Sequence, residues 1–276
     1  MTKICNYQKP TELCFSSSEW EFIPNEIDFI NNSLRLIESK FSSQNLLFRK
    51  AENTDIINLE KFIQYRYSCF SPEIAEEISK YDLYRFINFG HGLILEDSSS
   101  KILACLFEVG YNTPDKTSYT LRLGVDDILK GKNIGKLLIE YSSLLAMKNG
   151  SLTKRGLLDL TNFSSAVILL NKIGWICDGF YKDLTGLGTC FNIVFPLRMD
   201  SFYNNRIDDQ KLQLFLKESK SEIDFKIVPY FDVESLDKIY SSEDFKIIYL
   251  LRGGLFTERN SFLAIPSDKL NITYCN

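Results

Sequence analysis

Residues 130–136, a short stretch of glycine and lysine between two apolar segments, constrain the fold of this chain more than any other feature. Before them, apolar residues alternate with smaller or polar ones, as on a β-strand, at Tyr119, Leu121, Leu123 and Val125. After them, apolar residues recur at helical spacing from Ile134 to Leu145, and the pattern ends at Asn149-Gly150, where a left-handed helix cap is tolerated. The sequence therefore predicts a strand, a glycine loop and a helix.

The loop has the composition of a phosphate-binding turn. The first N–H groups of a helix have no partner within the helix and carry the positive end of its dipole. Gly131 and Gly135 present no side chain that would keep a ligand away, and Asn133 accepts a left-handed conformation. Positive charge comes from three side chains, those of Lys130, Lys132 and Lys136. The pattern indicates a cradle for a pyrophosphate, and the alternative is an ordinary exposed turn.

Residues 125–135 also resemble the signature of the GNAT superfamily of N-acetyltransferases. In that family a strand ending in Val leads to Arg/Gln-x-x-Gly-x-Gly/Ala. Lys130 stands at the Arg/Gln position, Asn133 at the first glycine and Gly135 at the second. The loop has neither the Gly-Lys-Ser/Thr of a Walker loop nor the Gly-x-Gly-x-x-Gly register of a dinucleotide site.

A second segment resembles the same family. There the pattern is Asn-x-x-Ala-x-x-Leu-Tyr-x-Lys-x-Gly-Phe, and the residues here that match it are Ala166, Leu169, Lys172, Gly174 and Trp175. Leu170 occupies the tyrosine position. Phe163 stands at the asparagine position, with Asn162 one residue early.

The remaining elements are expected in the order of a GNAT domain. They are a strand at 45–51, a helix capped at Thr54-Asp55, a helix from Ser71-Pro72 to Phe89-Gly90, a hairpin of 92–96 and 101–109 with a turn at 112–115 after it, a strand at 156–161, a helix from Ser164 to Gly174, and strands at 178–181 and 190–195. The resemblance implies the GNAT acyl-CoA N-acyltransferase fold, an α/β (α+β) fold with a mixed central sheet flanked by helices and with additions at both termini.

The resemblance divides the chain into three parts. Residues 1–45 form an N-terminal extension with a helix starting at Pro24-Asn25, and residues 46–198 form the N-acetyltransferase domain. Residues 199–276 form a small C-terminal subdomain of unknown role, with a helix near 211–216 and strands at 225–228 and 245–251.

Charge and cysteine usage limit the function classes. With a net charge of -4 and a pI near 5.3, the chain is not expected to bind nucleic acid as its main function. Seven scattered cysteines without a Cys-x-x-Cys pair and a single histidine, His91, argue against a disulfide framework or a metal site. No signal-peptide core or membrane-length apolar run is present, so a cytoplasmic protein is expected.

The resemblance implies that acetyl-CoA is the co-substrate and that the acceptor is an amine. It assigns the pantetheine arm and thioester to the backbone of Leu123-Gly124-Val125, and the pyrophosphate to residues 130–136 (Lys130, Gly131, Lys132, Asn133, Ile134, Gly135 and Lys136). Asn162 is a further candidate for cofactor binding. The runner-up function is a non-catalytic acyl-CoA-binding module whose terminal segments bind a partner, and the third is a structural domain that has lost the cofactor.

Side chains for proton transfer are harder to assign, because Leu170 replaces the usual acid and residues 119–125 contain no carboxylate. Glu108 is a candidate base acting through water, and a solvated strand carboxylate is the alternative. Tyr119 and Tyr181 are candidate acids or bases, and a packed strand tyrosine is the alternative for each.

Overall fold

The computed structural model describes most of the chain, in residues 4–9, 25–68, 80–110, 114–184, 188–199, 202, 205–217, 224–242 and 244–275. The helix start expected at Ser71-Pro72 and part of the turn expected at 112–115 lie outside these residues. The chain forms two compact units. We call residues 23–156 the contiguous unit, and residues 1–22 together with 157–276 the split unit.

The contiguous unit is a mixed sheet covered by helices. Its helical elements are α1 (Glu26–Ser42), a 3₁₀ turn (Asn53–Asp55), α2 (Ile56–Ser68), α4 (Lys80–Phe89), a second 3₁₀ turn (Asp127–Leu129) and α5 (Ile134–Lys148). Its strands are β2 (Leu47–Lys50), β3 (Gly90–Glu96), β4 (Ile102–Val109), β5 (Thr117–Val125) and the first half of β6 (Thr153–Asp159). The strand order is β2-β3-β4-β5-β6, and only β5 and β6 run parallel.

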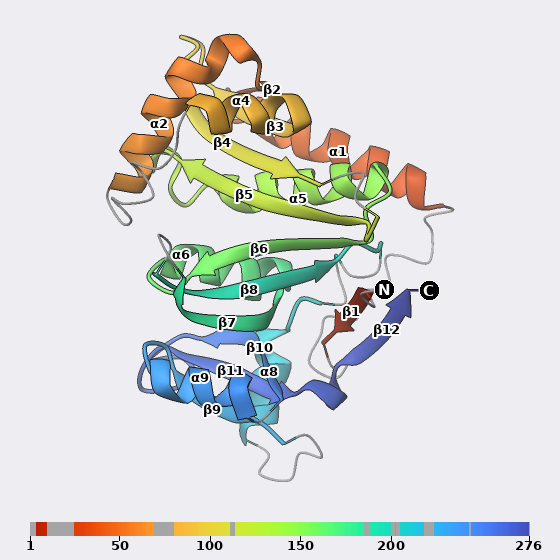
Figure 1. Ribbon diagram of the computed structural model, residues 1–276, viewed down its shortest axis with the longest axis vertical. Coiled ribbons are helices and arrows are strands. Elements are labelled where there is room, and N and C mark those ends of the chain that lie inside the picture. Colours follow the sequence, from red (N-terminus) through yellow and green to blue (C-terminus); the bar gives the residue numbers. More distant parts are fainter. Residues whose placement is uncertain are drawn as a thin grey trace. The chain divides into compact units, whose positions relative to one another are not determined.

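Among the described residues, two helices cover each face of this sheet. Successive side chains of a strand point to opposite faces. On β4, the Phe107 ring contacts Phe86 of α4, whereas the neighbouring Glu108 contacts Lys154 and lies on the face of α5. The N-terminal helix α1 runs alongside α5 (Figure 1), where Tyr141 donates a hydrogen bond to Glu38 at 2.8 Å. Helices α2 and α4 therefore cover one face, and α1 and α5 cover the other.

The split unit combines the N-terminal strand with everything after residue 156. Its elements are β1 (Ile4–Gln8), the end of β6, α6 (Phe163–Ala166), a π-helix (Val167–Ile173), β7 (Ile176–Leu184), β8 (Gly188–Pro196), α8 (Asp209–Lys217), β9 (Lys226–Pro229), α9 (Val233–Ser242), β10 (Phe245–Leu251), β11 (Ser261–Pro266), a 3₁₀ turn (Ser267–Lys269) and β12 (Asn271–Cys275). The sheet order after β6 is β8-β7-β10-β11-β9. Strands β1 and β12 form a separate antiparallel pair, so that the two termini lie side by side (Figure 1).

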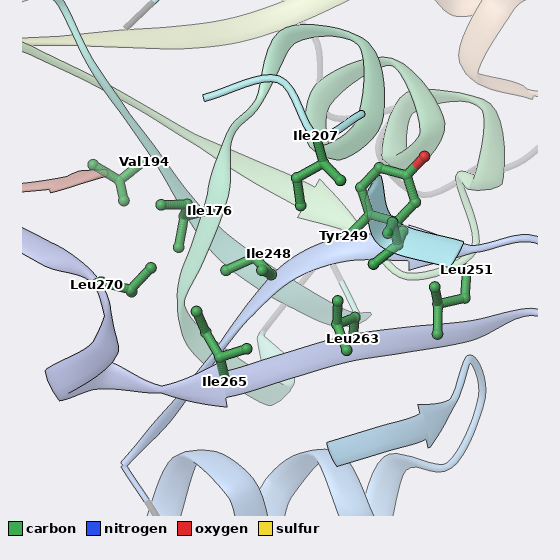
Figure 2. Close-up of a cluster of buried hydrophobic side chains, with 10 residues drawn as sticks. Ile176, Val194, Ile207, Ile248, Tyr249, Leu251, Leu263, Ile265 and Leu270 are labelled. Carbon is green, nitrogen blue, oxygen red and sulfur yellow. The ribbon is translucent and has the colours of Figure 1, made fainter. Parts of the chain in front are cut away.

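One core joins β7 and β8 to the C-terminal strands. Figure 2 shows buried side chains from these elements packed together, among them Ile176, Val194, Ile248, Leu263 and Ile265. Strand β10 pairs with β7 at Ile247 and Cys177. The predicted domain 46–198 therefore contributes residues to both compact units, because the division falls within β6.

The predicted fold class is confirmed, since the sheet is mixed, helices flank it and additions are present at both ends. Two predicted helix caps are wrong. Helix α2 is preceded by a 3₁₀ turn capped by Glu52, in which Asp55 reaches back to the Glu52 N–H at 2.8 Å. Asn162, not Ser164, caps α6, and the expected end at Gly174 is present with φ +102°. The parallel strand begins at Thr153, three residues before the predicted start at 156.

An arginine with two carboxylate partners ties β2, β3 and the start of α2 together. Both Nη atoms of Arg49 donate to Asp55, at 2.7 and 2.8 Å, and the guanidinium also donates to Glu96, at 2.6 and 3.1 Å. Both carboxylates are buried. Hydrogen bonds from Arg49 lower the pKa of Asp55 against the opposing effect of burial.

Replacing Arg49 by methionine should therefore leave two buried carboxylates without a counter-charge. We expect Arg49→Met to lower the free energy of unfolding by about 3 kcal/mol in denaturant titrations at pH 7. The matched control is Arg35→Met on the exposed surface of α1, which should change it by less than about 0.5 kcal/mol. Equal effects of the two variants would contradict a stabilising role for the network.

The ion pair between Arg49 and Asp55 also predicts that the stability of the protein depends on pH. Because the folded pKa of Asp55 is depressed, its contribution to stability is present above its unfolded pKa of about 3.9 and is lost as the pH falls through the folded value. The stability difference between wild type and Arg49→Met should thus be largest near neutral pH and should narrow below about pH 4. A difference that stays constant from pH 7 to pH 3 would argue against this linkage.

Candidate functional site

Strand β5 is hydrogen-bonded on both edges over only part of its length. Its pairing with β6 runs from Thr117 to Thr120, opposite Thr153 to Gly156. Residues 122–125 are paired with β4 alone in the described register, and Leu121 is paired with neither strand. One edge of that half-strand therefore presents backbone groups to something other than β6.

A β-bulge sits where the two-sided pairing ends. Phe107 lies opposite Arg122, while the next β4 residue, Glu108, lies opposite Thr120, so that Leu121 has no partner on β4. Cross-strand neighbours share a face of the sheet. Arg122 therefore lies on the face of α2 and α4, and Thr120 lies on the face of α5. Bulges of this kind re-aim side chains and occur often beside active sites.

The predicted glycine loop joins β5 to α5. Asp126 caps the 3₁₀ turn by accepting from the Ile128 N–H at 3.1 Å. Gly131 then adopts φ +81° and Asn133 adopts φ +59°, and α5 starts at Ile134. Among the described residues, no acceptor receives a hydrogen bond from the backbone N–H of Gly131, Ile134 or Gly135. Three free amides at the start of a long helix fit an anionic ligand such as a pyrophosphate.

The loop is held at its base and open at its tip. Arg66 of α2 binds Asp127 through two contacts of 3.0 and 3.2 Å, and this pair lowers the pKa of Asp127. Leu129 is buried, whereas Lys130 and Lys132 are exposed. Lys136 is half-buried, 3.6 Å from Glu140. The predicted cofactor loop thus has a base held by Arg66 and the buried Leu129, with exposed lysines at its tip.

The β5 residues assigned to the cofactor arm lie directly before this loop. A Cβ on Gly124 would meet the Phe62 ring of α2 at 3.0 Å, so glycine lets the helix approach the strand. The Leu123 carbonyl accepts a hydrogen bond from the Tyr67 hydroxyl at 3.3 Å, and Val125 pairs with Ala104 of β4. Tyr67 was not singled out from the sequence, because nothing local signals a contact over 56 residues.

Glu108 is not a solvated strand carboxylate. It is fully buried, and one oxygen contacts the equally buried Lys154 ammonium at 2.9 Å. The ammonium also donates to the Ser142 hydroxyl of α5. Burial lowers the pKa of Lys154, and the charge of Glu108 opposes this shift. The second carboxylate oxygen and the hydroxyls of Ser118 and Thr120 are buried without hydrogen-bond partners among the described residues.

The other predicted side chains lie in different surroundings. Tyr119 is exposed on β5 and Tyr181 is exposed on β7 of the split unit, and neither hydroxyl has a hydrogen-bond partner in the described part of the chain. Asn162 accepts from the Ser165 N–H at 3.1 Å as the cap of α6. Leu170 is fully buried in the π-helix, and its carbonyl accepts from the buried Lys9 ammonium at 3.0 Å. The structure thus brings Tyr119 and the cofactor loop into one unit, and Asn162 and Tyr181 into the other.

Within the described ranges, no three His, Cys, Asp or Glu side chains are grouped so as to hold a metal ion. In the same residues, every helix is too short or too polar to span a membrane.

No protein-family model and no curated protein matches the chain. Solved structures do match. A chain of the NatC complex bound to Gag peptide and CoA is 16% identical, with a TM-score of 0.47 over 56% of this chain and 99% of that one. A Desulfovibrio desulfuricans protein assigned to the GNAT family of acetyltransferases is 11% identical (TM-score 0.47; 55% and 99% covered). The PaiA N-acetyltransferase of Thermoplasma acidophilum with coenzyme A is 20% identical (TM-score 0.42; 54% and 97% covered).

The buried ion pair between Glu108 and Lys154 yields a double-mutant test. Lys154→Met or Glu108→Leu alone should lower the free energy of unfolding by about 3–5 kcal/mol, because each leaves a buried charge unpaired. The double variant should recover most of this loss, since neither charge remains. Denaturant titrations of the four proteins measure the coupling, and additive losses would show that the pair is not coupled.

Proposed function

We propose that this protein is an acetyl-CoA-dependent N-acetyltransferase that transfers an acetyl group to a primary amine of a small molecule or protein. The observation that carries the proposal is the arrangement of backbone groups that have no strand or helix partner. The free amides of Gly131, Ile134 and Gly135 directly follow the half of β5 that has no β6 partner. A phosphate ligand with an amide-containing arm would satisfy both sets.

The residues present fit acetyl-CoA in two places. The loop amides, with Lys130, Lys132 and Lys136 around them, would hold the pyrophosphate. The backbone of Leu123 and Val125 would hold the pantetheine arm. When bound, acetyl-CoA supplies an acetyl thioester, which an amine attacks at the carbonyl carbon.

Proton transfer is the second requirement, because only the neutral amine is nucleophilic. Tyr119 is the candidate in the contiguous unit whose side chain is exposed on β5. Tyr181 offers a similar group in the split unit. Glu108 would act only through intervening water or hydroxyl groups, since its carboxylate is buried against Lys154. The thiolate needs less help in leaving than an alkoxide, as a thiol has a pKa of about 8.5.

The buried pairing of Glu108 also favours a second candidate, a non-catalytic acyl-CoA-binding module. Leu170 supports it, because a buried aliphatic side chain stands where the resemblance implies an acid. Calorimetric titration with acetyl-CoA tests both functions, and thiol release with a panel of amines separates them. Binding without thiol release from any amine would favour the module, and failure to bind acetyl-CoA would refute both.

Two glycines provide a matched test of the loop. Gly131 and Gly150 flank α5 with nearly equal φ, +81° and +84°, and a Cβ at either would meet no atom within 4 Å. Alanine at either position should thus cost a similar 1–2 kcal/mol of backbone strain. We expect Gly131→Ala to weaken CoA binding about tenfold in calorimetry, because the strain disturbs the amides that face the ligand.

The control is Gly150→Ala, which should match Gly131→Ala in stability and match wild type in CoA affinity. Similar affinities for the two variants would remove the loop from the binding site.

A further inference from the structure

Arg122 is a partly buried cation that has no carboxylate partner among the described residues. Its guanidinium lies over the Tyr67 ring, 5.8 Å from the centroid, and Nη1 makes a long contact of 3.4 Å with the Leu121 carbonyl. Nε is shielded from solvent and donates to no acceptor in the part of the chain that the structure describes. No acidic side chain among those residues forms an ion pair with it. In these surroundings, most of the N–H groups of the guanidinium donate to no acceptor among the described residues.

Two other arginines of the contiguous unit differ from Arg122 in having carboxylate partners, although Nε of Arg66 is likewise buried without an acceptor among the described residues. Arg49 has two carboxylate partners, Asp55 and Glu96, and Arg66 has one, Asp127. A charge removed from water is costly unless it is paired, and a buried N–H group without an acceptor adds to this cost. The Tyr67 ring and the Leu121 carbonyl offset only part of the cost of removing the Arg122 charge from water, and a carboxylate on a ligand would supply the missing partner.

The position of Arg122 indicates which ligand it would meet. It follows the bulge at Leu121 and faces α2, and its neighbour is Leu123, whose carbonyl contacts the same Tyr67. Under the proposed function, the backbone of Leu123 lies along the acyl-donor arm. The guanidinium thus stands beside the strand that would carry the thioester, on the face covered by α2 and α4.

We propose that Arg122 recognises a carboxylate of the substrate. Guanidinium and carboxylate match in charge and in planar, two-pronged geometry. Two sources share this chemistry: the carboxylate of an amino acid that serves as the acceptor, and the free carboxylate of a dicarboxylic acyl group on CoA. A polyamine acceptor fits less well, because like charges repel and no acidic side chain of the described residues forms an ion pair with Arg122 to offset this repulsion. The inference rests on the proposed acyl transfer.

The experiment compares substrates that differ only in a carboxylate. Wild type and Arg122→Gln are assayed for thiol release with acetyl-CoA and a panel of amino acids against their carboxamides, and with succinyl-CoA against acetyl-CoA. We expect Arg122→Gln to lower kcat/KM about 10- to 100-fold for the carboxylate-bearing substrate and to leave its neutral counterpart unchanged. Discrimination in the first comparison assigns the carboxylate to the acceptor, and discrimination in the second assigns it to the acyl group.

Controls separate this inference from the function on which it rests. Arg35→Gln on the exposed surface of α1 should behave as wild type, and Arg122→Lys should keep part of the preference. Calorimetry should show that Arg122→Gln binds CoA as tightly as wild type, because the loop amides are untouched. Wild type that fails to bind CoA would refute the proposed function itself.

Two results would contradict the role of Arg122 without contradicting the proposed acyl transfer. The first is turnover in which wild type and Arg122→Gln treat each acid and its amide alike. The second applies where no panel amine is turned over: N-acetyl amino acids and their amides are then titrated into the CoA-loaded protein. Tighter binding of the acids by wild type, lost in Arg122→Gln, supports the proposal, and equal binding by both proteins overturns it.

Discussion

Strand β5 pairs with β6 over only part of its length, and this partial pairing is the constraint on which the rest of the contiguous unit depends. A strand inside a sheet normally uses both edges, but β5 has a β6 partner only up to Thr120. The remaining half is held by β4 on one edge and by α2 packed against Gly124 on one face. The same strand then leads into the loop whose helix amides are also free. Because the half-strand without a β6 partner and the free helix amides adjoin each other, we propose this part of the unit as the place that takes up a ligand.

The sequence predicted the parts of this arrangement that are local in the chain. Alternation, helical periodicity and glycine positions lie within a few residues of each other, and the strand, loop and helix followed from them. The two caps failed for an equally local reason. Asp55 can serve as a cap or as the residue that reaches back to Glu52, and Asn162 and Ser164 are both good caps, so spacing alone does not decide between them.

Long-range contacts and irregular strand pairing could not be predicted from the sequence. Lys154 is 46 residues from Glu108, and no pattern links them, so the carboxylate could be read as solvated. Simple alternation puts Thr120 and Arg122 on the same face of β5, whereas the bulge at Leu121 puts them on opposite faces. Arg122, in a strand that otherwise alternates apolar residues, was the one available signal of a binding site. Whether an arginine in a strand binds a ligand depends on which side chains surround it, and only the fold determines these.

The pairing of β1 with β12 has a consequence for the order in which the protein folds. Ile4 lies opposite Cys275, and Lys9, next to β1, reaches the π-helix 161 residues away, so that residues 4–9 make their contacts with chain that is synthesised much later. The strand pairs β2-β3, β3-β4 and β4-β5 of the contiguous unit have no such dependence, since both strands of each pair lie within residues 23–156. We expect this unit to form first and the first strand to be protected last, as contacts over long loops form slowly. Hydrogen exchange pulsed during refolding would measure this order, in which residues 4–8 become protected only when residues 271–275 pair with them.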